Sequence, residues 1–273
     1  MKSDVVIIGA GHAGGMTAIS LRQRRYQGSI TLIGEENFFP YQRPALSKEF
    51  LAGKIEEKKL YLKSRDYFEK NNINIKRNCE VLAIDRNNKT VLLENKQQFG
   101  YKKLIIATGS IVNKLKASRK ETDLLYLRTI KDSLKIREKL SSKNKITIVG
   151  AGYIGLEIAS IAIKKNLEVS ILELENRVMG RVVSLDVSDF LQKKHQSEGV
   201  EFKFNTSISD IEDQGKQKRI ICSDGSFFNT DVVIVGVGIK PNIELAKNSG
   251  LKCDNGILVG DNGQTSDCHI FAV

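Results

Sequence analysis

The chain contains two copies of the glycine pattern G-x-G-x-x-G in matching sequence surroundings. The first copy occupies residues 9–14 and follows the apolar run 5–8, and the second occupies residues 150–155 and follows the apolar run 146–149. One such pattern alone is weak evidence, because glycine-rich turns are common. Two copies, each between a β-branched strand and an amphipathic helix, predict two dinucleotide-binding units. The economical use of two such units in one chain is to pass electrons between two dinucleotides.

Each glycine of the pattern has its own physical role. The first permits a tight turn, the second lets the backbone approach a pyrophosphate, and the third lets the helix pack closely on the strand. The N-terminus of the helix then presents free N–H groups to the negative charge of the phosphates. The glycines expected to bind dinucleotides are Gly9, Gly11, Gly14, Gly150, Gly152 and Gly155.

An acidic residue follows the second predicted strand in each half of the chain. Glu35 comes after the strand predicted over 29–34, and Glu173 comes after the strand predicted over 169–172. An ionised carboxylate at this position accepts hydrogen bonds from both ribose hydroxyls and repels a 2′-phosphate. The second site is therefore predicted to bind NAD rather than NADP, while Arg177 nearby keeps the NADP alternative open.

Length and composition predict two domains and no membrane span. At 273 residues, 41% of them hydrophobic, the chain has room for two buried cores. Its longest apolar runs have the length of strands, and the first predicted strand begins too near residue 1 to leave room for a signal peptide. Scattered cysteines without a C-x-x-C pair predict reduced thiols, a cytoplasmic location and no metal site. These cysteines are Cys79, Cys222, Cys253 and Cys268.

The chain is basic, with a formal net charge of +11 from 43 Lys and Arg against 32 Asp and Glu. A basic excess is compatible with nucleic acid, an anionic membrane surface or an acidic protein partner. The lysines are dispersed along the chain, and no concentrated basic arm or aromatic-basic module is present in the sequence. We therefore expect a solvated surface and no nucleic acid or membrane partner.

The second half of the chain repeats the first. Helices are predicted over residues 13–25 and 154–165, and closing strands over 103–109 and 231–238. The stretch 38–48, with its prolines and aromatic residues, is predicted to be a fixed, packed loop. The fold class is therefore α/β, with two Rossmann-like dinucleotide-binding domains, the second inserted in the first. The predicted domains are 1–112 plus 241–273, and 113–240.

Several further segments carry a family resemblance. The most specific is 41–48, Tyr-Gln-Arg-Pro-Ala-Leu-Ser-Lys, which is similar to an Arg-Pro-Pro-Leu-Ser-Lys flavin loop with Ala45 in place of the second proline. The other matching segments are 107–109, 127–129, 152–157 and 237–242. With them the whole chain resembles the FAD-dependent pyridine nucleotide-disulfide oxidoreductase superfamily. Within it, the chain looks most like the NADH-dependent ferredoxin or rubredoxin reductases of oxygenase systems.

The resemblance implies FAD on the first half and NADH on the second. The FAD contacts that it implies are Gly9, Gly11, Ala13, Gly14, Glu35, Arg43, Lys48, Val81, Ala107 and Arg128. The NADH contacts that it implies are Gly152, Gly155, Glu173 and Gly236. The remaining residues expected to bind a cofactor are Thr108, Gly109, Gly150 and Ile154.

The resemblance also implies a catalytic pair, Lys48 and Glu157. Lys48 resembles a lysine that approaches the flavin ring, and Glu157 resembles the glutamate paired with it across the domain boundary. A cation near the flavin stabilises the anionic reduced form, and a carboxylate positions that cation. We therefore expect the two side chains to lie within the range of about 4–6 Å at which charges couple.

The sequence departs from the family pattern in two ways. Disulfide-reducing relatives carry a redox cysteine after the first ribose-binding acid, and residues 35–48 contain none. This favours electrons that leave the flavin directly for another carrier. Family members also continue after the segment 270–273 with Gly-Asp, whose aspartate binds the flavin ribityl chain, and with a third domain. We therefore expect an incomplete FAD-binding domain without the C-terminal domain, from a truncated gene product, the first half of a split gene or a fragment.

The resulting expectation is a flavoprotein reductase. It would pass a hydride from NADH to FAD and then single electrons to a ferredoxin or rubredoxin type carrier. One alternative is an NADH oxidase or redox-sensing flavoprotein that uses oxygen or quinone. Another is a catalytically silent nucleotide-binding fragment. The oligomeric state is left open by the sequence.

Overall fold

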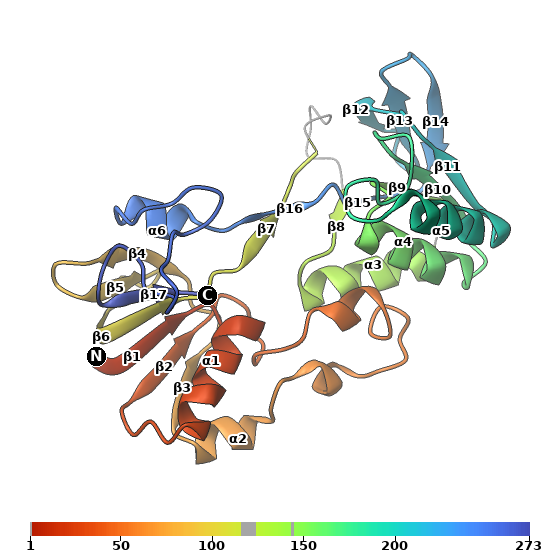
Figure 1. The fold of residues 1–273 in the computed structure, drawn as a ribbon. Helices are drawn as coiled ribbons and strands as arrows, with labels where there is room; N and C mark the ends of the chain where they lie inside the picture. Colours follow the sequence, from red (N-terminus) through yellow and green to blue (C-terminus); the bar gives the residue numbers. More distant parts are fainter. Residues whose placement is uncertain (1, 116–123, 143–144) are drawn as a thin grey trace. The chain divides into compact units, whose positions relative to one another are not determined.

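The computed structural model describes residues 2–115, 124–142 and 145–273, which form two compact units. Unit 1 consists of Met1–Arg43, Glu57–Ile111 and Lys240–Val273. Unit 2 consists of Pro44–Glu56 and Val112–Ile239 (Figure 1). Each unit is an α/β fold, which confirms the predicted fold class.

Unit 1 is built on a largely parallel sheet of strand order β3-β2-β1-β6-β5-β4, with β17 paired to the remaining part of β6. The parallel strands are β1 (Lys2–Ile8), β2 (Ile30–Ile33), β3 (Ile73–Lys76), β6 (Gln98–Ile106) and β17 (Ile270–Ala272). The antiparallel strands are β4 (Val81–Asp85) and β5 (Thr90–Leu93).

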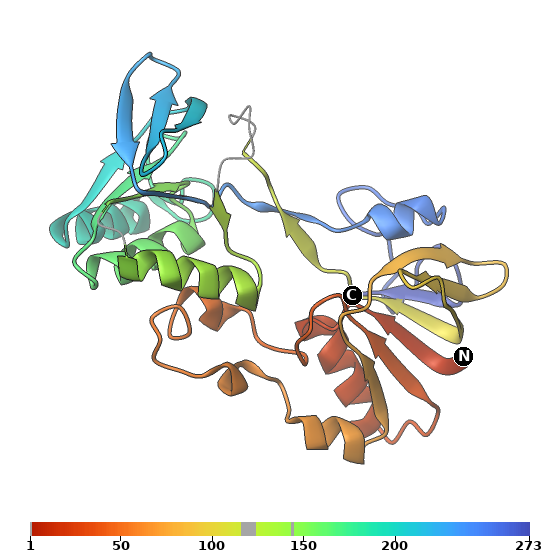
Figure 2. The same ribbon diagram turned by 180° about the vertical axis from the view of Figure 1, so that it is seen from behind.

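Alternate side chains of β1 enter two different cores, because successive residues of a strand point to opposite faces. Val5 and Ile7 pack in the core that contains Ala18 and Phe68 of the helices α1 (His12–Gln23) and α2 (Arg65–Lys70). Val6 and Ile8 pack in the core that includes residues of the short helix α6 (Glu244–Asn248). Figures 1 and 2 show α1 and α2 on the same side of this sheet. A short 3₁₀ helix, η2 (Glu57–Leu60), completes the unit.

Unit 2 repeats this plan around a fully parallel sheet of order β11-β10-β9-β15-β8. Its strands are β8 (Leu125–Tyr126), β9 (Lys145–Val149), β10 (Glu168–Leu172), β11 (Val200–Lys203) and β15 (Val232–Val235). Its helices are α3 (Ile130–Ser142), α4 (Tyr153–Ile163) and α5 (Leu185–Ser197). The order β11-β10-β9-β15 corresponds to β3-β2-β1-β6 of unit 1, so the predicted duplication is present.

Two smaller sheets accompany the main ones. The antiparallel strands β12 (Ile208–Asp213), β13 (Lys218–Cys222) and β14 (Phe227–Thr230) contribute Ile211 and Ile220 to a core with Val149 and Val233. They therefore cover one face of the unit 2 sheet. The strands β7 (Ser110–Val112) and β16 (Ile239–Pro241) form a two-stranded sheet.

Residues 44–56 pack with unit 2, whereas the sequence prediction included them in the first domain, 1–112 plus 241–273. The segment begins with a 3₁₀ turn, η1 (Pro44–Ser47), whose Leu46 carbonyl accepts a hydrogen bond of 2.7 Å from the fully buried Ser133 hydroxyl on α3. Arg137, one turn further along α3, donates to the Phe50 carbonyl and lies 4.5 Å from the centre of the Phe50 ring. The prediction from the sequence placed this segment in the first domain, because contacts with residues so far along the chain leave no local pattern in the sequence.

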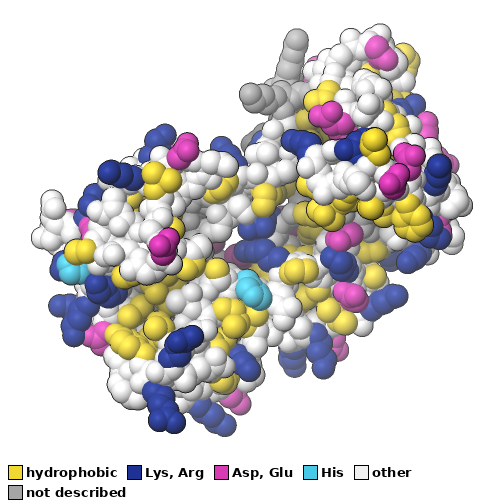
Figure 3. All heavy atoms as spheres, in the orientation of Figure 1, with side chains coloured by type: hydrophobic (Ala, Val, Ile, Leu, Met, Phe, Trp, Pro, Cys, Tyr) yellow, Lys and Arg dark blue, Asp and Glu magenta, His cyan; other side chains and the backbone are white. Residues whose placement is uncertain are grey.

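Charged side chains are spread over the face of the molecule drawn in Figure 3. Figure 3 shows Lys and Arg side chains dispersed over the face that it presents. Among the residues that the structure describes, no helix is long and apolar enough to cross a membrane. The same part of the chain has no group of three or more His, Cys, Asp or Glu side chains arranged to hold a metal ion.

The loop before β17 is tied to the rest of unit 1 by Arg86 and Asp267. The Arg86 Nε donates to Asp267 Oδ2 at 2.9 Å, and its Nη1 donates to the carbonyls of Ser249 and Gly250 after α6. Burial alone would raise the pKa of the Asp267 carboxyl, but the His269 N–H and the Arg86 guanidinium outweigh it and lower the pKa below its usual value of 3.8.

This tie predicts a pH-dependent contribution to stability. A carboxyl group whose pKa is lowered in the folded state stabilises the fold at pH values above its ordinary pKa. This stabilisation is lost as the pH falls through the pKa of the group in the folded state. We expect Asp267→Asn to lower the free energy of unfolding by about 1–3 kcal/mol at pH 7, with a difference that shrinks below about pH 4. Urea unfolding at several pH values measures this. Asp261→Asn, at an exposed position of the same loop, is the control, and equal effects of both variants would contradict the tie.

Candidate dinucleotide sites

The first glycine turn joins β1 to α1 through a backbone contact that only glycine permits. Gly9 has φ +105°, and a Cβ atom built there would lie 2.1 Å from the Ala107 carbonyl oxygen at the end of β6. A Cβ on Gly14 would lie 2.0 Å from the Gly9 carbonyl oxygen. The first and third glycines therefore bring strand, turn and helix together, as predicted.

The second turn has the same geometry in unit 2. Gly150 has φ +103°, and its Cβ would lie 2.6 Å from the Gly236 carbonyl oxygen after β15. A Cβ on Gly155 would lie 2.2 Å from the Gly150 carbonyl oxygen. Ala107 and Gly236 thus occupy equivalent places, each against the first glycine of its turn.

The middle glycines are much less crowded than the first and third. No atom lies within 4 Å of a Cβ built on Gly152, and the nearest atom to one on Gly11 is Nη2 of Arg43, at 3.8 Å. Both are N-cap residues, of α4 and α1, and glycine has no side chain to occupy the first amides of these helices. The space and the unpaired N–H groups together fit a pyrophosphate.

The two ribose-binding candidates differ in their surroundings. Glu35 follows β2, and burial, with the nearby carboxylates of Glu36 and Glu80, raises the pKa of its carboxyl, against the opposing effect of Arg43. In the part of the chain that the structure describes, no hydrogen bond or ion pair occupies the Glu35 carboxylate. Its oxygens are therefore available for ribose hydroxyls.

Glu173, by contrast, is already bound to backbone amides. Its Oε2 accepts from the Ala151 N–H at 2.6 Å, and its Oε1 accepts from the Glu175 N–H at 3.0 Å. The carboxylate is thereby fixed beside the second glycine turn, with lone pairs left for a ribose. Arg177 donates to the carbonyls of Gly180 and Val183, so its guanidinium is held by its own loop.

Lys48 and Glu157 form the predicted ion pair. The Lys48 ammonium lies 2.7 Å from Glu157 Oε1, which confirms the expected proximity of the two side chains. Both belong to unit 2, so the pair does not join the two units as the sequence suggested. Glu157 lies on α4, in the turn after the glycines, which places the pair near the start of the helix that carries the second fingerprint.

No role for Ser47 was predicted from the sequence, although it lies within the matching loop. The Ser47 hydroxyl donates to Glu157 Oε2 at 2.5 Å, so consecutive residues hold both oxygens of one carboxylate. Glu36 and Tyr41, which contact Arg43, were also given no role. Their only sequence signal is the position next to Glu35 and inside the loop 38–48.

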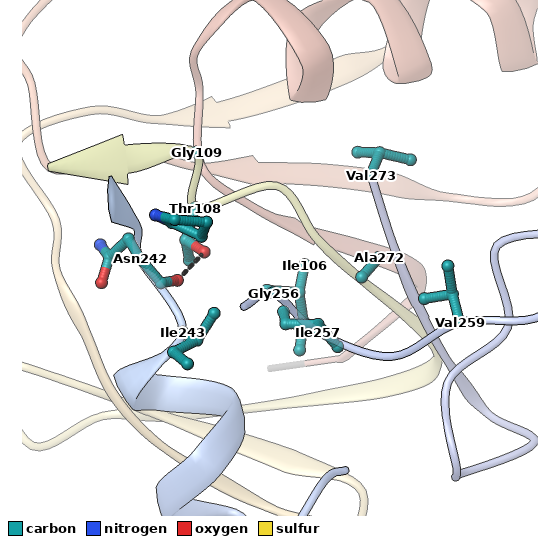
Figure 4. Close-up of a pocket in the computed structure, with 11 residues that line it drawn as sticks. Ile106, Thr108, Gly109, Asn242, Ile243, Gly256, Ile257, Val259, Ala272 and Val273 are labelled. Carbon is teal, nitrogen blue, oxygen red and sulfur yellow. Dashed lines mark hydrogen bonds between the residues drawn. The ribbon is translucent and has the colours of Figure 1, made fainter. Parts of the chain in front are cut away.

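The remaining candidates are distributed over both units. Thr108 and Gly109 line a cavity of about 240 Å³ in unit 1, at the carboxyl end of β6 and β17 (Figure 4). The Thr108 hydroxyl donates to the Asn242 carbonyl at 2.7 Å and is thereby occupied. Ala13 and Ile154 are exposed in the first turns of α1 and α4. Val81 begins β4, and Arg128, like Lys48, belongs to unit 2.

Comparisons with known proteins agree with this geometry. A family model described as pyridine nucleotide-disulphide oxidoreductase matches residues 3–273. Putidaredoxin reductase CamA of Pseudomonas putida is 38% identical over 279 residues, which covers 100% of this chain and 66% of that protein. Rubredoxin-NAD(+) reductase of Pseudomonas putida is 36% identical over 271 residues, with coverage of 98% and 70%. The crystal structure of a covalent putidaredoxin reductase–putidaredoxin complex matches with TM-score 0.95 and 37% identity, with coverage of 99% and 67%.

The fold and the two glycine turns define a protein with two dinucleotide-binding units. The chain belongs to the pyridine nucleotide-disulphide oxidoreductase family. It spans 66% and 70% of the length of the two Pseudomonas putida relatives.

The geometry predicts different roles for the middle glycine and the third glycine of each turn. Gly11→Ala adds a methyl group whose nearest neighbour, Arg43 Nη2, is at an ordinary van der Waals distance of 3.8 Å, so we expect the free energy of unfolding to change by less than about 1 kcal/mol while FAD retention falls. Gly14→Ala is the matched variant in the same helix. Alanine normally stabilises a helix interior by about 0.5–1 kcal/mol relative to glycine, so destabilisation by Gly14→Ala reports the clash with Gly9. Urea unfolding and flavin absorbance measure both effects, and equal destabilisation by the two variants would contradict the assignment.

Glu173 is predicted to set the preference of unit 2 for NADH. Glu173→Ala removes the carboxylate that repels a 2′-phosphate, so the preference for NADH over NADPH should narrow by about 1–3 kcal/mol. Titration of each nucleotide measures this. Glu175→Ala, which removes a neighbouring acid but keeps the Glu175 amide, is the control. An unchanged preference in Glu173→Ala would remove the role that we give this residue.

Proposed function

We propose that this chain is an FAD-dependent, NADH-oxidising reductase that delivers electrons to a ferredoxin or rubredoxin type carrier. Family membership supports this proposal, as do relatives named putidaredoxin reductase and rubredoxin-NAD(+) reductase. The observation that carries it is the pair of equivalent glycine turns, in each of which the middle glycine is free of the backbone contacts that crowd the first and third. FAD binds unit 1 and NADH binds unit 2 in this proposal.

The residues of the chain bind and orient the two dinucleotides. The turns around Gly11 and Gly152 take the pyrophosphates, and Glu35 and Glu173 take the riboses. FAD, when bound, supplies the chemistry of accepting a hydride and releasing single electrons. The protein contributes position and charge to that chemistry.

Lys48 is the candidate catalytic cation. Its ammonium is 44% exposed, so the ion pair with Glu157 adds little stability by itself. The pair instead fixes the direction of a positive charge, because Glu157 is in turn held by Ser47. A cation held in place stabilises the anionic reduced flavin without rearranging during the reaction.

The cysteines support transfer from the flavin to a separate carrier. All four are free thiols, and none lies between Glu35 and Lys48. No disulfide of the chain is thus placed to accept electrons at the position used by disulfide reductases. The free thiols also favour the cytoplasm as the location that we propose.

Carrier-dependent turnover tests the proposal. The chain is supplied with FAD, NADH, a rubredoxin or a [2Fe–2S] ferredoxin, and cytochrome c as the final acceptor. We expect NADH-dependent cytochrome c reduction that requires the carrier. Equal NADH consumption without the carrier would indicate an oxidase, and absence of bound flavin would indicate a nucleotide-binding protein without activity. Either result would overturn the proposal.

A lysine variant tests the role of the ion pair. Lys48→Ala should lower carrier-dependent turnover by about 10–100-fold, which corresponds to about 1.4–2.8 kcal/mol of lost transition-state stabilisation. NADH affinity should stay within about twofold, since a group that acts mainly in the transition state adds little to ground-state binding. Lys54→Ala, at an exposed lysine of the same segment, is the control. Equal effects of the two variants would show that the loop needs only positive charge.

A further inference from the structure

Arg43 is held by a closed ring of hydrogen bonds in unit 1. Its Nη2 donates to Glu36 Oε1 at 2.9 Å, and its Nη1 donates to the Tyr41 hydroxyl oxygen at 3.0 Å. The Tyr41 hydroxyl donates in turn to Glu36 Oε2 at 2.7 Å. Both oxygens of the Glu36 carboxylate are therefore occupied, and two nitrogens of the guanidinium are fixed in direction.

Burial strengthens this ring. Tyr41 is 2% exposed, and the Arg43 and Glu36 side chains are 27% and 20% exposed. The Arg43 guanidinium carbon also lies 5.1 Å from the centre of the Tyr41 ring. Charges in such surroundings are screened less by solvent than a surface pair, so the preferred direction of the guanidinium is well defined.

The ring lies beside the first glycine turn. The Arg43 Nη2 atom is 3.8 Å from the position that a Cβ of Gly11 would take, and it is the nearest atom to that position. The guanidinium is thus next to the N-terminus of α1, where backbone amides are free to bind an anion. Its planar fork of donors matches the geometry of phosphate oxygens.

The adjacent acids Glu35 and Glu36 have different partners. Glu36 is committed to Arg43 and Tyr41, whereas the Glu35 carboxylate has no hydrogen bond or ion pair among the described residues. Glu36 therefore holds the guanidinium, while Glu35 keeps both of its oxygens for the ribose.

We propose that Glu36 and Tyr41 are positioning residues, which aim the Arg43 guanidinium at the pyrophosphate of the dinucleotide in unit 1. Glu35 is left to bind the ribose. This inference rests on the proposed function, because it takes FAD as the ligand of unit 1. It goes beyond that function by assigning the orientation of the Arg43 guanidinium to the ring of hydrogen bonds with Glu36 and Tyr41.

A double-mutant cycle on FAD affinity tests the inference. Tyr41→Phe removes one hydroxyl without changing charge, and we expect the Kd for FAD to rise by about 2–12-fold, the range of one neutral hydrogen bond. Arg43→Lys keeps the charge but loses the fork, so it should also weaken binding. In the Arg43→Lys background, Tyr41→Phe should change the Kd by less than about twofold, because the group that it positions is gone.

The chain offers a matched control in Tyr61. Its backbone forms a bridge with Tyr41, but its hydroxyl donates to Glu57 rather than to a member of the ring. Tyr61→Phe should leave the Kd for FAD unchanged. Glu36→Asp provides a second test of the ring if Tyr41→Phe impairs folding, since the shorter side chain keeps its charge but cannot span both partners. The thermal midpoint of the FAD-free protein monitors folding in each case.

The outcomes separate the inference from the function on which it rests. An unchanged Kd in Tyr41→Phe and Glu36→Asp, with FAD bound by the unaltered chain, would overturn the positioning role alone. Equal effects of Tyr41→Phe in the unaltered chain and in the Arg43→Lys variant would do the same, because a general structural defect gives additive changes. Failure of the unaltered chain to bind FAD would overturn both the inference and the proposed function.

Discussion

The close approach of helix to strand at each glycine turn is the constraint on which the two sites depend. The Gly9 turn leaves 2.1 Å between a hypothetical Cβ and the Ala107 carbonyl, and the Gly150 turn leaves 2.6 Å to the Gly236 carbonyl. These contacts place the N-termini of α1 and α4 at the carboxyl ends of their sheets, where α/β folds bind ligands. The space in front of Gly11 and Gly152 follows from that placement.

Charged groups around these turns are fixed by neighbours rather than left mobile. Glu173 is held by two backbone amides, and Glu157 by a serine hydroxyl and a lysine ammonium. Long charged side chains lose rotamer entropy when a ligand orders them, so prior ordering lowers the cost of binding. Unit 2 therefore combines an open backbone cradle with charges that already point in a set direction.

The sequence predicted the elements with local signatures and missed those that depend on distant contacts. Glycine spacing and strand patterns located both turns, the duplication and the helix starting at residue 12, within one residue of expectation. The same reasoning joined residues 44–56 to unit 1, because only Ser133 and Arg137, far along the chain, reveal where the segment packs. Roles for Ser47 and Glu36 were missed for the same reason: neither stands out from its neighbours without the contacts of the folded chain.

The central claim is that one chain binds FAD and NADH at separate turns and passes a hydride between them. Anaerobic titration of the FAD-loaded protein with NADH, followed by the absorbance of oxidised flavin, tests it most directly. The account predicts that NADH reduces the flavin of the unaltered chain stoichiometrically. It also predicts that NADH does not reduce the flavin of Gly152→Val, because this variant retains flavin but fills the open space of the second turn. Persistence of flavin reduction in Gly152→Val, or no reduction by NADH in the unaltered chain, would contradict it.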